Sequence, residues 1–456
     1  MSLIYSPKIV TDGLVLCLDA KQNSSFPSIT LPVKDGLILW LDAADDNVFN
    51  YSSGTTNVSQ WRDKSGLNNH VNQTNITYQP ERSTSTNGKK TILFSSDYLI
   101  TDSNILKAYT SYTKIAVVKQ TSTSTAGNII GKSTGANTTF WYGGTNNIRL
   151  YHNSNTILTS SIATTLNTWN ILSGSFDSVS LNANIYVNGS SGGSATSPTV
   201  TQITTDSDVE IGGFGGAANY FTGEISEILI FNRVLSTTEL KQVHTYLGQK
   251  WGISNNDKIW CDLSGNNHVC SLYGSPSWDG LKFAFPDNQI TVYAVLPVNA
   301  LNGLTSGTIY TLELITSFDN TNSEYFFSCA TAANNNLFII FKSTILQPFA
   351  ATQGLGTPTP IAAGETMHLM ISNNSGTVSI YKNGEFTCSW TGSVCDNDLK
   401  TTEGWVLNQE QDSVLGGFDP TQCAAMKTSV IRLYDKVLSA QEIKQNFNAT
   451  RSRFGL

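Results

Sequence analysis

The sequence is poor in charge and has no long apolar run. Charged residues make up 13% of its 456 residues, roughly half the share of about 25% in an average soluble domain. The net charge of −7 includes no basic block, which argues against nucleic-acid binding. No stretch of about twenty apolar residues occurs, so we expect no membrane insertion. The start of the sequence lacks the apolar core of a signal peptide, which predicts synthesis and folding in a cytoplasm.

Cysteine chemistry is also sparse. The seven cysteines form no Cys-x-x-Cys pair and have no histidine near enough to complete a zinc set. We interpret them as small apolar core residues, with a Cys388–Cys395 disulfide as the alternative. All seven lie outside residues 31–254.

What the sequence does contain is a nested repeat. Residues 11–20 read TDGLVLCLDA and residues 34–43 read KDGLILWLDA, so that Cys17 stands where the second copy has Trp40. About twenty residues are too few to bury a core, so the rest of the first copy must lie further along the chain. Three further motifs recur in the same order: Trp-x-Asp-x-Ser-Gly at 61–66 and 260–265, Tyr-x-Asn-Gly at 186–189 and 381–384, and Val-Leu-Ser-x-x-Glu at 234–239 and 437–442. This order predicts an inner domain, 31–254, inserted into an outer domain formed by 1–30 and 255–456.

Both copies are rich in short β-branched and aromatic runs separated by Gly, Asn, Ser and Thr. Examples are 114–119, 148–151, 169–173 and 227–231 in the inner copy and 290–295, 337–341, 367–371 and 430–434 in the outer copy. This pattern is typical of an all-β sandwich. Helices are predicted at 237–250 and 440–450, where Ser236 with Glu239 and Ser439 with Glu442 form capping boxes. The leucines of the two first strands, Leu16 and Leu18 or Leu39 and Leu41, should be interior and equivalent.

Taken together, the ordered motifs resemble the concanavalin A-like, laminin G-like jelly roll, and more narrowly the version found in virion structural proteins of tailed bacteriophages and other large DNA viruses. The resemblance covers nearly the whole chain. It implies two antiparallel β-sandwich jelly rolls, one inserted into the other, each with a short C-terminal helix and with its first and last strands side by side. Members of this family bind glycans, bind proteins or build particles.

The acidic motifs have structural and metal-binding interpretations. Asp63 and Asp262, followed by Ser-Gly two residues later, predict turns in which the side chain accepts hydrogen bonds from backbone amides. The resemblance also implies calcium at a loop edge, and Asp42, Asp45 and Asp46 form the one acidic cluster that could hold it. The outer copy has no such cluster after Asp19. His70 and His268 recur at matching positions, but each lacks a Cys or His neighbour.

Only a few residues of the sequence are candidates for catalysis or for glycan binding. Glycoside hydrolases need two carboxylates on one face, and the nearest pair, Glu224 and Glu227, should point to opposite faces of a regular strand. We therefore expect no enzyme and no cofactor other than calcium. Trp141, Tyr142 and Trp278 are the candidates for glycan contacts, with burial in the core as the alternative.

These observations predict a non-enzymatic virion structural protein, such as a head-decoration, fibre or tail-associated protein, with lectin-like domains. Its expected partners are other virion or capsid proteins and host-surface glycans, and homo-oligomers are compatible with this function. The alternatives are a dedicated carbohydrate-binding adhesin and, less favoured, a glycoside hydrolase.

Overall fold

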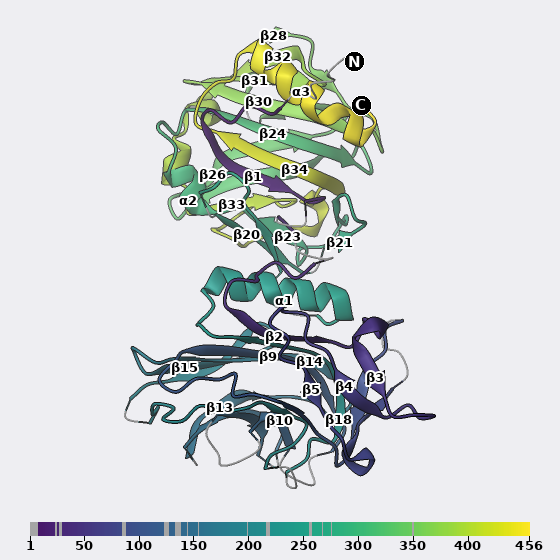
Figure 1. Ribbon diagram of the computed structural model, residues 1–456. Helices are drawn as coiled ribbons and strands as arrows, with labels where there is room; N and C mark the ends of the chain where they lie inside the picture. Colours follow the sequence, from purple (N-terminus) through teal and green to yellow (C-terminus); the bar gives the residue numbers. More distant parts are fainter. Residues whose placement is uncertain are drawn as a thin grey trace. The chain divides into compact units, whose positions relative to one another are not determined.

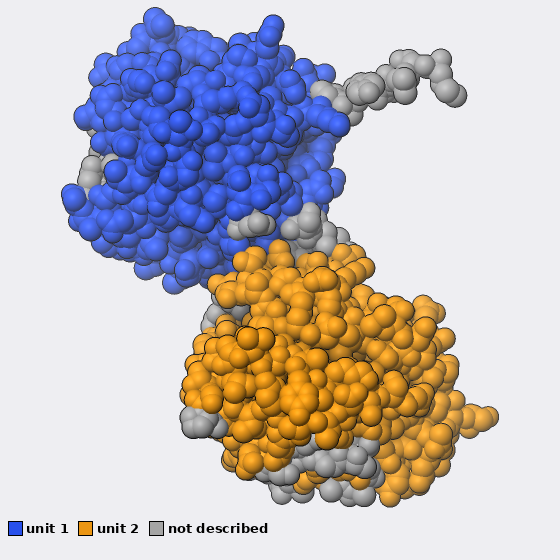
Figure 2. All heavy atoms as spheres, turned by 60° about the vertical axis from the view of Figure 1, so that its left-hand side comes forward, with its two compact units in different colours: residues 1–27, 258–456 blue, residues 28–257 orange. Residues whose placement is uncertain are grey.

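The protein consists of two compact units. The computed structural model describes residues 8–22, 25–26, 30–83, 88–122, 127–132, 138–143, 145–153, 155–197, 199–215, 219–254, 258–266, 268–274, 276–348 and 351–456. We call residues 1–27 with 258–456 the outer unit and residues 28–257 the inner unit (Figures 1 and 2). The junctions predicted from the sequence, 30/31 and 254/255, lie beside residues 27–29 and 255–257, which are outside the described residues. Independent folding of each unit stays a prediction.

The inner unit has two antiparallel sheets. The first has the order β13 (Asn155–Ala163), β12 (Asn147–His152), β11 (Thr139–Tyr142), β10 (Gly127–Gly131), β17 (Glu210–Ile211), β8 (Leu99–Thr101), β5 (Val71–Asn72), β4 (Val58–Trp61) and β3 (Phe49–Tyr51). The second has the order β16 (Ser190–Ala195), β15 (Asn182–Val187), β14 (Trp169–Asp177), β9 (Tyr112–Gln120), β18 (Gly223–Phe231), β7 (Ile92–Phe94) and β6 (Glu81–Arg82), and β2 (Leu37–Asp42) also pairs with β18.

The outer unit has the same arrangement. One sheet has the order β21 (Ser277–Trp278), β22 (Phe283–Phe285), β34 (Met426–Tyr434), β24 (Ile309–Phe318), β30 (Met367–Asn374), β31 (Thr377–Lys382), β32 (Glu385–Thr391) and β28 (Thr352–Gly356), and β1 (Leu14–Asp19) pairs with β34. The other has the order β19 (Ile259–Cys261), β20 (Val269–Tyr273), β23 (Tyr293–Val295), β33 (Gly404–Leu407), β25 (Glu324–Thr331), β26 (Asn334–Lys342), β27 (Ile345–Pro348) and β29 (Thr359–Pro360).

In both units the first strand pairs with the last. β2 lies antiparallel to β18 with Leu41 opposite Ile228, and β1 lies antiparallel to β34 with Leu18 opposite Ile431. The all-β jelly-roll fold and the adjacency of first and last strands are therefore confirmed. Most predicted runs are strands, although the one predicted at 290–295 is shortened to β23.

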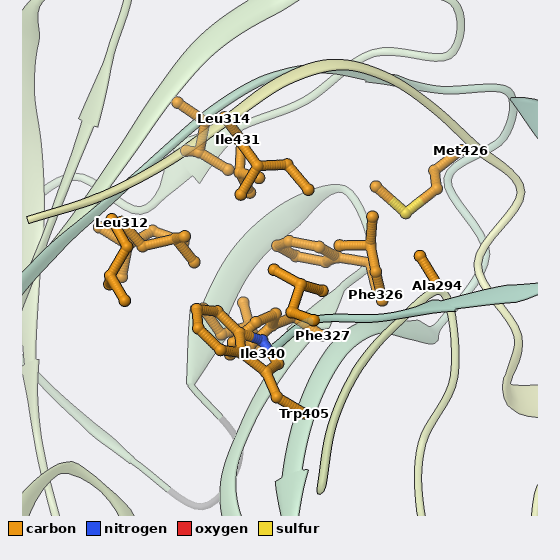
Figure 3. Close-up of a cluster of buried hydrophobic side chains, with 14 of the residues drawn as sticks. Ala294, Leu312, Leu314, Phe326, Phe327, Ile340, Trp405, Met426 and Ile431 are labelled. Carbon is orange, nitrogen blue, oxygen red and sulfur yellow. The ribbon is translucent and has the colours of Figure 1, made fainter. Parts of the chain in front are cut away.

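The core of each unit lies between its sheets. The paired leucines predicted to be interior, Leu16, Leu18, Leu39 and Leu41, are all fully buried, as period-two alternation requires of residues on one face. Figure 3 shows the outer core, where Leu312, Leu314 and Ile431 from one sheet face side chains of the other sheet, including those of Phe327, Ile340 and Trp405. The inner core is built in the same way from both sheets.

One long helix covers a sheet in each unit (Figure 1). α1 (Thr237–Trp251) packs on β9, β14 and β18, and α3 (Ala440–Phe454) packs on the sheet that contains β30 and β34. Both begin with the predicted capping box, Ser236 with Glu239 and Ser439 with Glu442, and both end at a glycine with left-handed backbone. The only other α-helix among the described residues is the short α2 (Val298–Asn302). Within those residues, no helix is long and apolar enough to cross a membrane.

The Asp-x-Ser-Gly turns hold the first strand of each unit. Asp63 Oδ1 accepts hydrogen bonds from the backbone N–H of Ser65 at 2.8 Å and of Trp40 at 2.9 Å. Asp262 Oδ1 does the same for Ser264 and Cys17, each at 2.8 Å. The predicted turns are confirmed, and their second role, fixing the end of β1 or β2, explains why the motif occurs once per unit.

The cysteines are core residues. All seven are buried and carry free thiols, so the interpretation as small apolar residues is confirmed and the Cys388–Cys395 disulfide is wrong. Burial raises the pKa of the Cys270 and Cys329 thiols well above the ordinary value, which keeps them protonated and unreactive.

Candidate functional site

The candidate site lies on the outer face of the first inner sheet, on β10, β11 and β12. Along β11 and β12, side chains alternate between the core and the opposite face. Phe140, Tyr142, Ile148 and Leu150 are fully buried in the core. Thr139 and Trp141 therefore point outward together, and the register places them opposite Tyr151 and Arg149.

A cavity of about 90 Å³ opens on this face. Its lining comes from the three strands and from the segment after β17, and consists of Asn128, Thr139, Trp141, Tyr151, Phe214 and Asn219. Two half-buried rings form part of the wall, because Trp141 and Tyr151 meet edge to face with centroids 5.7 Å apart. We call this cavity the Trp141 pocket. Aromatic walls with a few polar groups are typical of small-ligand sites.

Three polar atoms in the Trp141 pocket lack a hydrogen-bond partner among the described residues. Asn128 Oδ1, Thr139 Oγ1 and Trp141 Nε1 are buried, and none makes a hydrogen bond within the described residues. Asn128 and Thr139 are only 2% and 3% exposed. The Asn128 amide is fixed because its Nδ2 donates to the carbonyl of Asn219 at 3.2 Å. Since an unsatisfied buried polar group costs roughly 1–3 kcal/mol, this concentration of two acceptors and a donor points to a ligand or to ordered water.

A second aromatic surface adjoins the pocket. The rings of Tyr78, Tyr98 and Tyr220 are mutually in contact, with centroids 5.6 to 6.5 Å apart, and all three are half-buried. Tyr220 follows the pocket residue Asn219 and its backbone bridges to Asn128. The pocket therefore continues into a surface on which a longer ligand could lie.

The structure separates the three residues predicted to contact glycans. Trp141 lines the pocket. Tyr142, its neighbour on β11, points to the opposite face, is fully buried, and accepts a hydrogen bond from Thr164 Oγ1 at 3.1 Å. This corrects its candidacy, because a strand cannot present consecutive side chains on one face. Trp278 belongs to the edge of the outer core, where its ring lies 5.4 Å from Phe26 and its Nε1 donates to Ala20.

The three aspartates predicted to bind calcium form ion pairs with lysine and arginine side chains of the protein. Asp42 bonds Lys64 at 2.8 Å and Lys250 at 2.7 Å, and Asp45 bonds Lys64 at 3.0 Å. Asp46 pairs with Arg82 at 2.5 Å. Burial favours the neutral form of Asp42, but the charges of Lys250 and Lys64 outweigh it and lower its pKa.

This arrangement does not fit a calcium ion. Asp42 and Asp45 share the ammonium of Lys64, and Asp46 bonds the guanidinium of Arg82, so protein cations already engage all three carboxylates. Within the described residues no group of three or more His, Cys, Asp or Glu side chains could hold a metal. Calcium binding by the chain stays a prediction from the resemblance.

The two carboxylates considered for catalysis, Glu224 and Glu227, lie on the same face of β18, although the sequence predicted opposite faces. A β-bulge between Ile225 and Glu227 places Glu224 opposite Lys119 and Glu227 opposite Val117, and those two partners lie on one face of β9. The extra residue of the bulge reverses the expected alternation.

Both carboxylates are nevertheless engaged with other side chains, and Glu227 lies against α1. Glu224 pairs with Lys119. Glu227 is 1% exposed and accepts hydrogen bonds from Trp40, Tyr246 and Trp251 in addition to its ion pair with Lys250 at 2.7 Å. They tie strand to strand and sheet to helix.

Sequence reasoning found Trp141 by residue type but missed its companions. These companions are Thr139 on the same strand and Asn128, Tyr151 and Asn219 on other segments. Only the sheet register brings those other segments to Trp141. A partial signal existed, since alternation along β11 places Thr139 beside Trp141.

Two family matches divide along the two units. Residues 94–241 match the concanavalin A-like lectin/glucanases superfamily, of the laminin G type, and residues 282–453 match the pentaxin family. C-reactive protein of Sus scrofa is 26% identical over 168 residues, which are 36% of this chain and 73% of that protein.

Two solved structures are weakly similar to parts of the chain. The heptameric SAP-like pentraxin of Limulus polyphemus is 23% identical over 31% of this chain and 70% of its own, with a TM-score of 0.27. Domain 4 of an extracellular arabinanase from Geobacillus stearothermophilus is 14% identical over 46% of this chain and 98% of its own, with a TM-score of 0.34. Residues 94–241 are thus similar to a concanavalin A-like domain of the laminin G type and residues 282–453 to a pentaxin-family domain, and both units have jelly-roll folds.

Proposed function

We propose that this chain is a non-enzymatic, lectin-like protein that binds a saccharide in the Trp141 pocket of its inner unit. The observation that carries the proposal is the group of three buried polar atoms, on Asn128, Thr139 and Trp141, that have no partner within the described residues. Sugar hydroxyls can donate to Asn128 Oδ1, accept from Trp141 Nε1, and do either with Thr139 Oγ1. The apolar C–H face of a sugar ring can pack on the half-buried indole.

The non-enzymatic part of the proposal rests on the carboxylates. Glycoside hydrolysis uses an acid and a second carboxylate on either side of the bond to be cleaved. Glu224 and Glu227 are buried and paired with Lys119 and Lys250, on the sheet opposite the pocket. The residues described as lining the pocket include no carboxylate.

The cellular setting is a further part of the proposal. The protein is a virion component made in a host cytoplasm, attached to other virion or capsid proteins, and its saccharide is a host-surface glycan. The low charge and the resemblance of the ordered motifs support this setting. Particles washed at high salt should retain the protein by mass spectrometry, since attachment without a charged face does not depend on screened ion pairs. Release into the wash would contradict this setting.

Binding itself is tested by screening the full chain on a glycan array and measuring hits by calorimetry. We expect Trp141→Ala to weaken binding by at least tenfold, because it removes the stacking surface and a donor. Trp278→Ala is the matched control and should bind as the unchanged protein does. Circular dichroism checks that both variants fold. Unchanged binding in the Trp141 variant, or hydrolysis of any bound glycan, would contradict the proposal.

A further inference from the structure

Arg149 lies at the edge of the Trp141 pocket in a fixed position. It stands on β12 directly opposite Trp141 on β11, and its guanidinium carbon is 5.9 Å from the centroid of the indole ring. The guanidinium also lies against Gly143, where an added Cβ would overlap it. It shares the outer face of β12 with Tyr151, which lines the pocket. Arg149 is therefore held between a ring and the backbone.

Arg149 has no anionic partner in the part of the chain that the structure describes. It makes no salt bridge within the described residues, and its buried Nε is without a hydrogen bond there. Four other arginines behave differently, since each bonds a carboxylate: Arg82 with Asp46, Arg233 with Glu239, Arg432 with Glu313 and Arg453 with Asp19. A half-buried guanidinium that lacks such a partner offers a planar fork that matches a carboxylate or sulfate.

We propose that the Trp141 pocket is specific for an anionic saccharide, whose carboxylate or sulfate pairs with Arg149 while its sugar ring contacts Trp141. This inference rests on the proposed function and adds the charge of the ligand. The indole orients the sugar ring, and the guanidinium donates hydrogen bonds to the acidic group from the β12 side. Packing of Arg149 on Trp141 and Gly143 reduces the conformational freedom that the side chain loses on binding.

Other charged groups near the pocket are compatible with an anionic ligand. The buried carboxylate of Glu210 is on the same sheet, but β17 is three strands from β12, which is roughly 14 Å at the usual strand spacing. Lys132, just after β10, uses its Nζ to donate to the carbonyl of Asp206 at 3.4 Å. The acidic group at Arg149 therefore meets no neighbouring carboxylate on β10, β11 or β12, which contain none.

The experiment uses the full chain and pairs of oligosaccharides that differ only in one acidic group. One pair compares a uronic acid with its neutral sugar, and the other compares a sulfated sugar with its unsulfated form. We expect the acidic member to bind at least tenfold more tightly by calorimetry. Arg149→Gln should abolish this preference by weakening the acidic member at least tenfold more than the neutral member, whereas Arg149→Lys should retain part of it. Arg451→Gln is the matched control, because it removes the same charge from α3 of the outer unit.

The outcomes separate the two proposals. Equal binding of acidic and neutral members by the unchanged protein overturns the specificity for an anion and leaves saccharide binding intact. Equal loss of both members in Arg149→Gln, with normal circular dichroism, assigns Arg149 a structural role and also overturns it. Absence of binding to any member of either pair or of the array overturns both proposals.

Discussion

Each unit buries a carboxylate near the contact between its helix and its sheet, but different residues pair with that carboxylate in the two units. In the inner unit, Glu227 on β18 is paired with Lys250 from α1 at 2.7 Å. In the outer unit, the buried carboxylate is Glu313 on β24, and it pairs with Arg432 on the neighbouring strand β34 at 2.5 Å and with His368 on β30 at 2.9 Å. The helix of the outer unit contacts Glu313 through the amide of Asn446, which donates to it at 2.8 Å. Its Arg453 pairs with Asp19 on β1 at 2.7 Å, as Lys250 of α1 pairs with Asp42 on β2 at 2.7 Å.

The two units share their strand order, yet this order does not determine which strand carries the buried charged residues. In the inner unit the positions equivalent to Glu313 and Arg432 are Ile115 and Leu229, which face each other across β9 and β18. Both are fully buried and apolar. Both units therefore bind their helix through an ion pair to the first strand. They differ in the buried carboxylate, which pairs with the helix in the inner unit and with a neighbouring strand in the outer unit.

Trp40 of the inner unit and Cys17 of the outer unit occupy equivalent positions, and they differ in the space that they fill. The Trp40 indole fills space beside α1 and donates to Glu227 at 2.8 Å. Cys17 is much smaller, and beside it lies a cavity of about 380 Å³ bounded by Arg432, Thr450 and Arg453 among others. Burial raises the pKa of the Cys17 thiol, so it acts as a small apolar residue.

The largest expected effect comes from breaking the outer cluster. Burial favours neutral Glu313, but the charge of Arg432 and the hydrogen bond from His368 outweigh it and lower its pKa to about 2. Arg432→Met leaves this carboxylate buried without its main partner, which should cost the outer unit about 3–5 kcal/mol. Hydrogen exchange in urea, read on peptides of each unit, should find the inner unit unchanged.

The control for this change copies the inner unit. Glu313→Ile combined with Arg432→Leu recreates the apolar pair of Ile115 and Leu229, and removing both charges should cost less than removing one. A double variant that is less stable than Arg432→Met would show that the outer cluster cannot be exchanged for the inner one.

The first strands test whether the units are equivalent in the core. Leu18→Ala and Leu41→Ala should each cost about 2–5 kcal/mol, the usual range for a buried leucine, and each should destabilise only its own unit in the same exchange experiment. Val179→Ala, at an exposed position, is the control. Costs below about 1 kcal/mol for both leucines would contradict their placement in the core.

The buried lysines of the two units also differ. Lys342 in the outer unit pairs with Glu324 at 2.8 Å. Among the described residues, the ammonium of Lys114 in the inner core contacts only the carbonyl of Thr138 and the ring of Tyr112. Burial lowers the pKa of Lys114 from 10.5 to about 7. Between these values the unfolded chain binds more protons than the folded one, so the free energy of unfolding rises with pH.

From pH 7 to 9 this should stabilise the inner unit by roughly 2 kcal/mol. Urea unfolding at a series of pH values, monitored on inner-unit peptides, measures the slope. Lys114→Met should remove it, and an equal slope in that variant would assign the effect to other groups.

The sequence could predict the fold better than the site for a physical reason. Strands, capping boxes and Asp-x-Ser-Gly turns are local patterns, and their repetition in order revealed the common topology. The bulge at Ile225, the pairing of Asp42 with Lys250 and the meeting of Asn128 with Trp141 depend on register between distant segments. Residue type alone marked Trp141 and Tyr142 equally, and only the direction of each side chain distinguished them.

The smallest expected effect concerns calcium and the acidic cluster found only in the inner unit. Asp42, Asp45 and Asp46 are bound to lysine and arginine side chains, so a calcium ion would have to displace Lys64 and Arg82 before it could be coordinated. A ligand stabilises the folded state only as far as its concentration exceeds its dissociation constant, and such displacement weakens binding. Millimolar calcium, compared with a chelator, should therefore change the unfolding free energy of either unit by less than about 0.5 kcal/mol. Asp45→Asn combined with Asp46→Asn provides the matched control. Stabilisation of the inner unit that this variant abolishes would show that the aspartates bind calcium after rearranging, and would add a metal to the differences between the units.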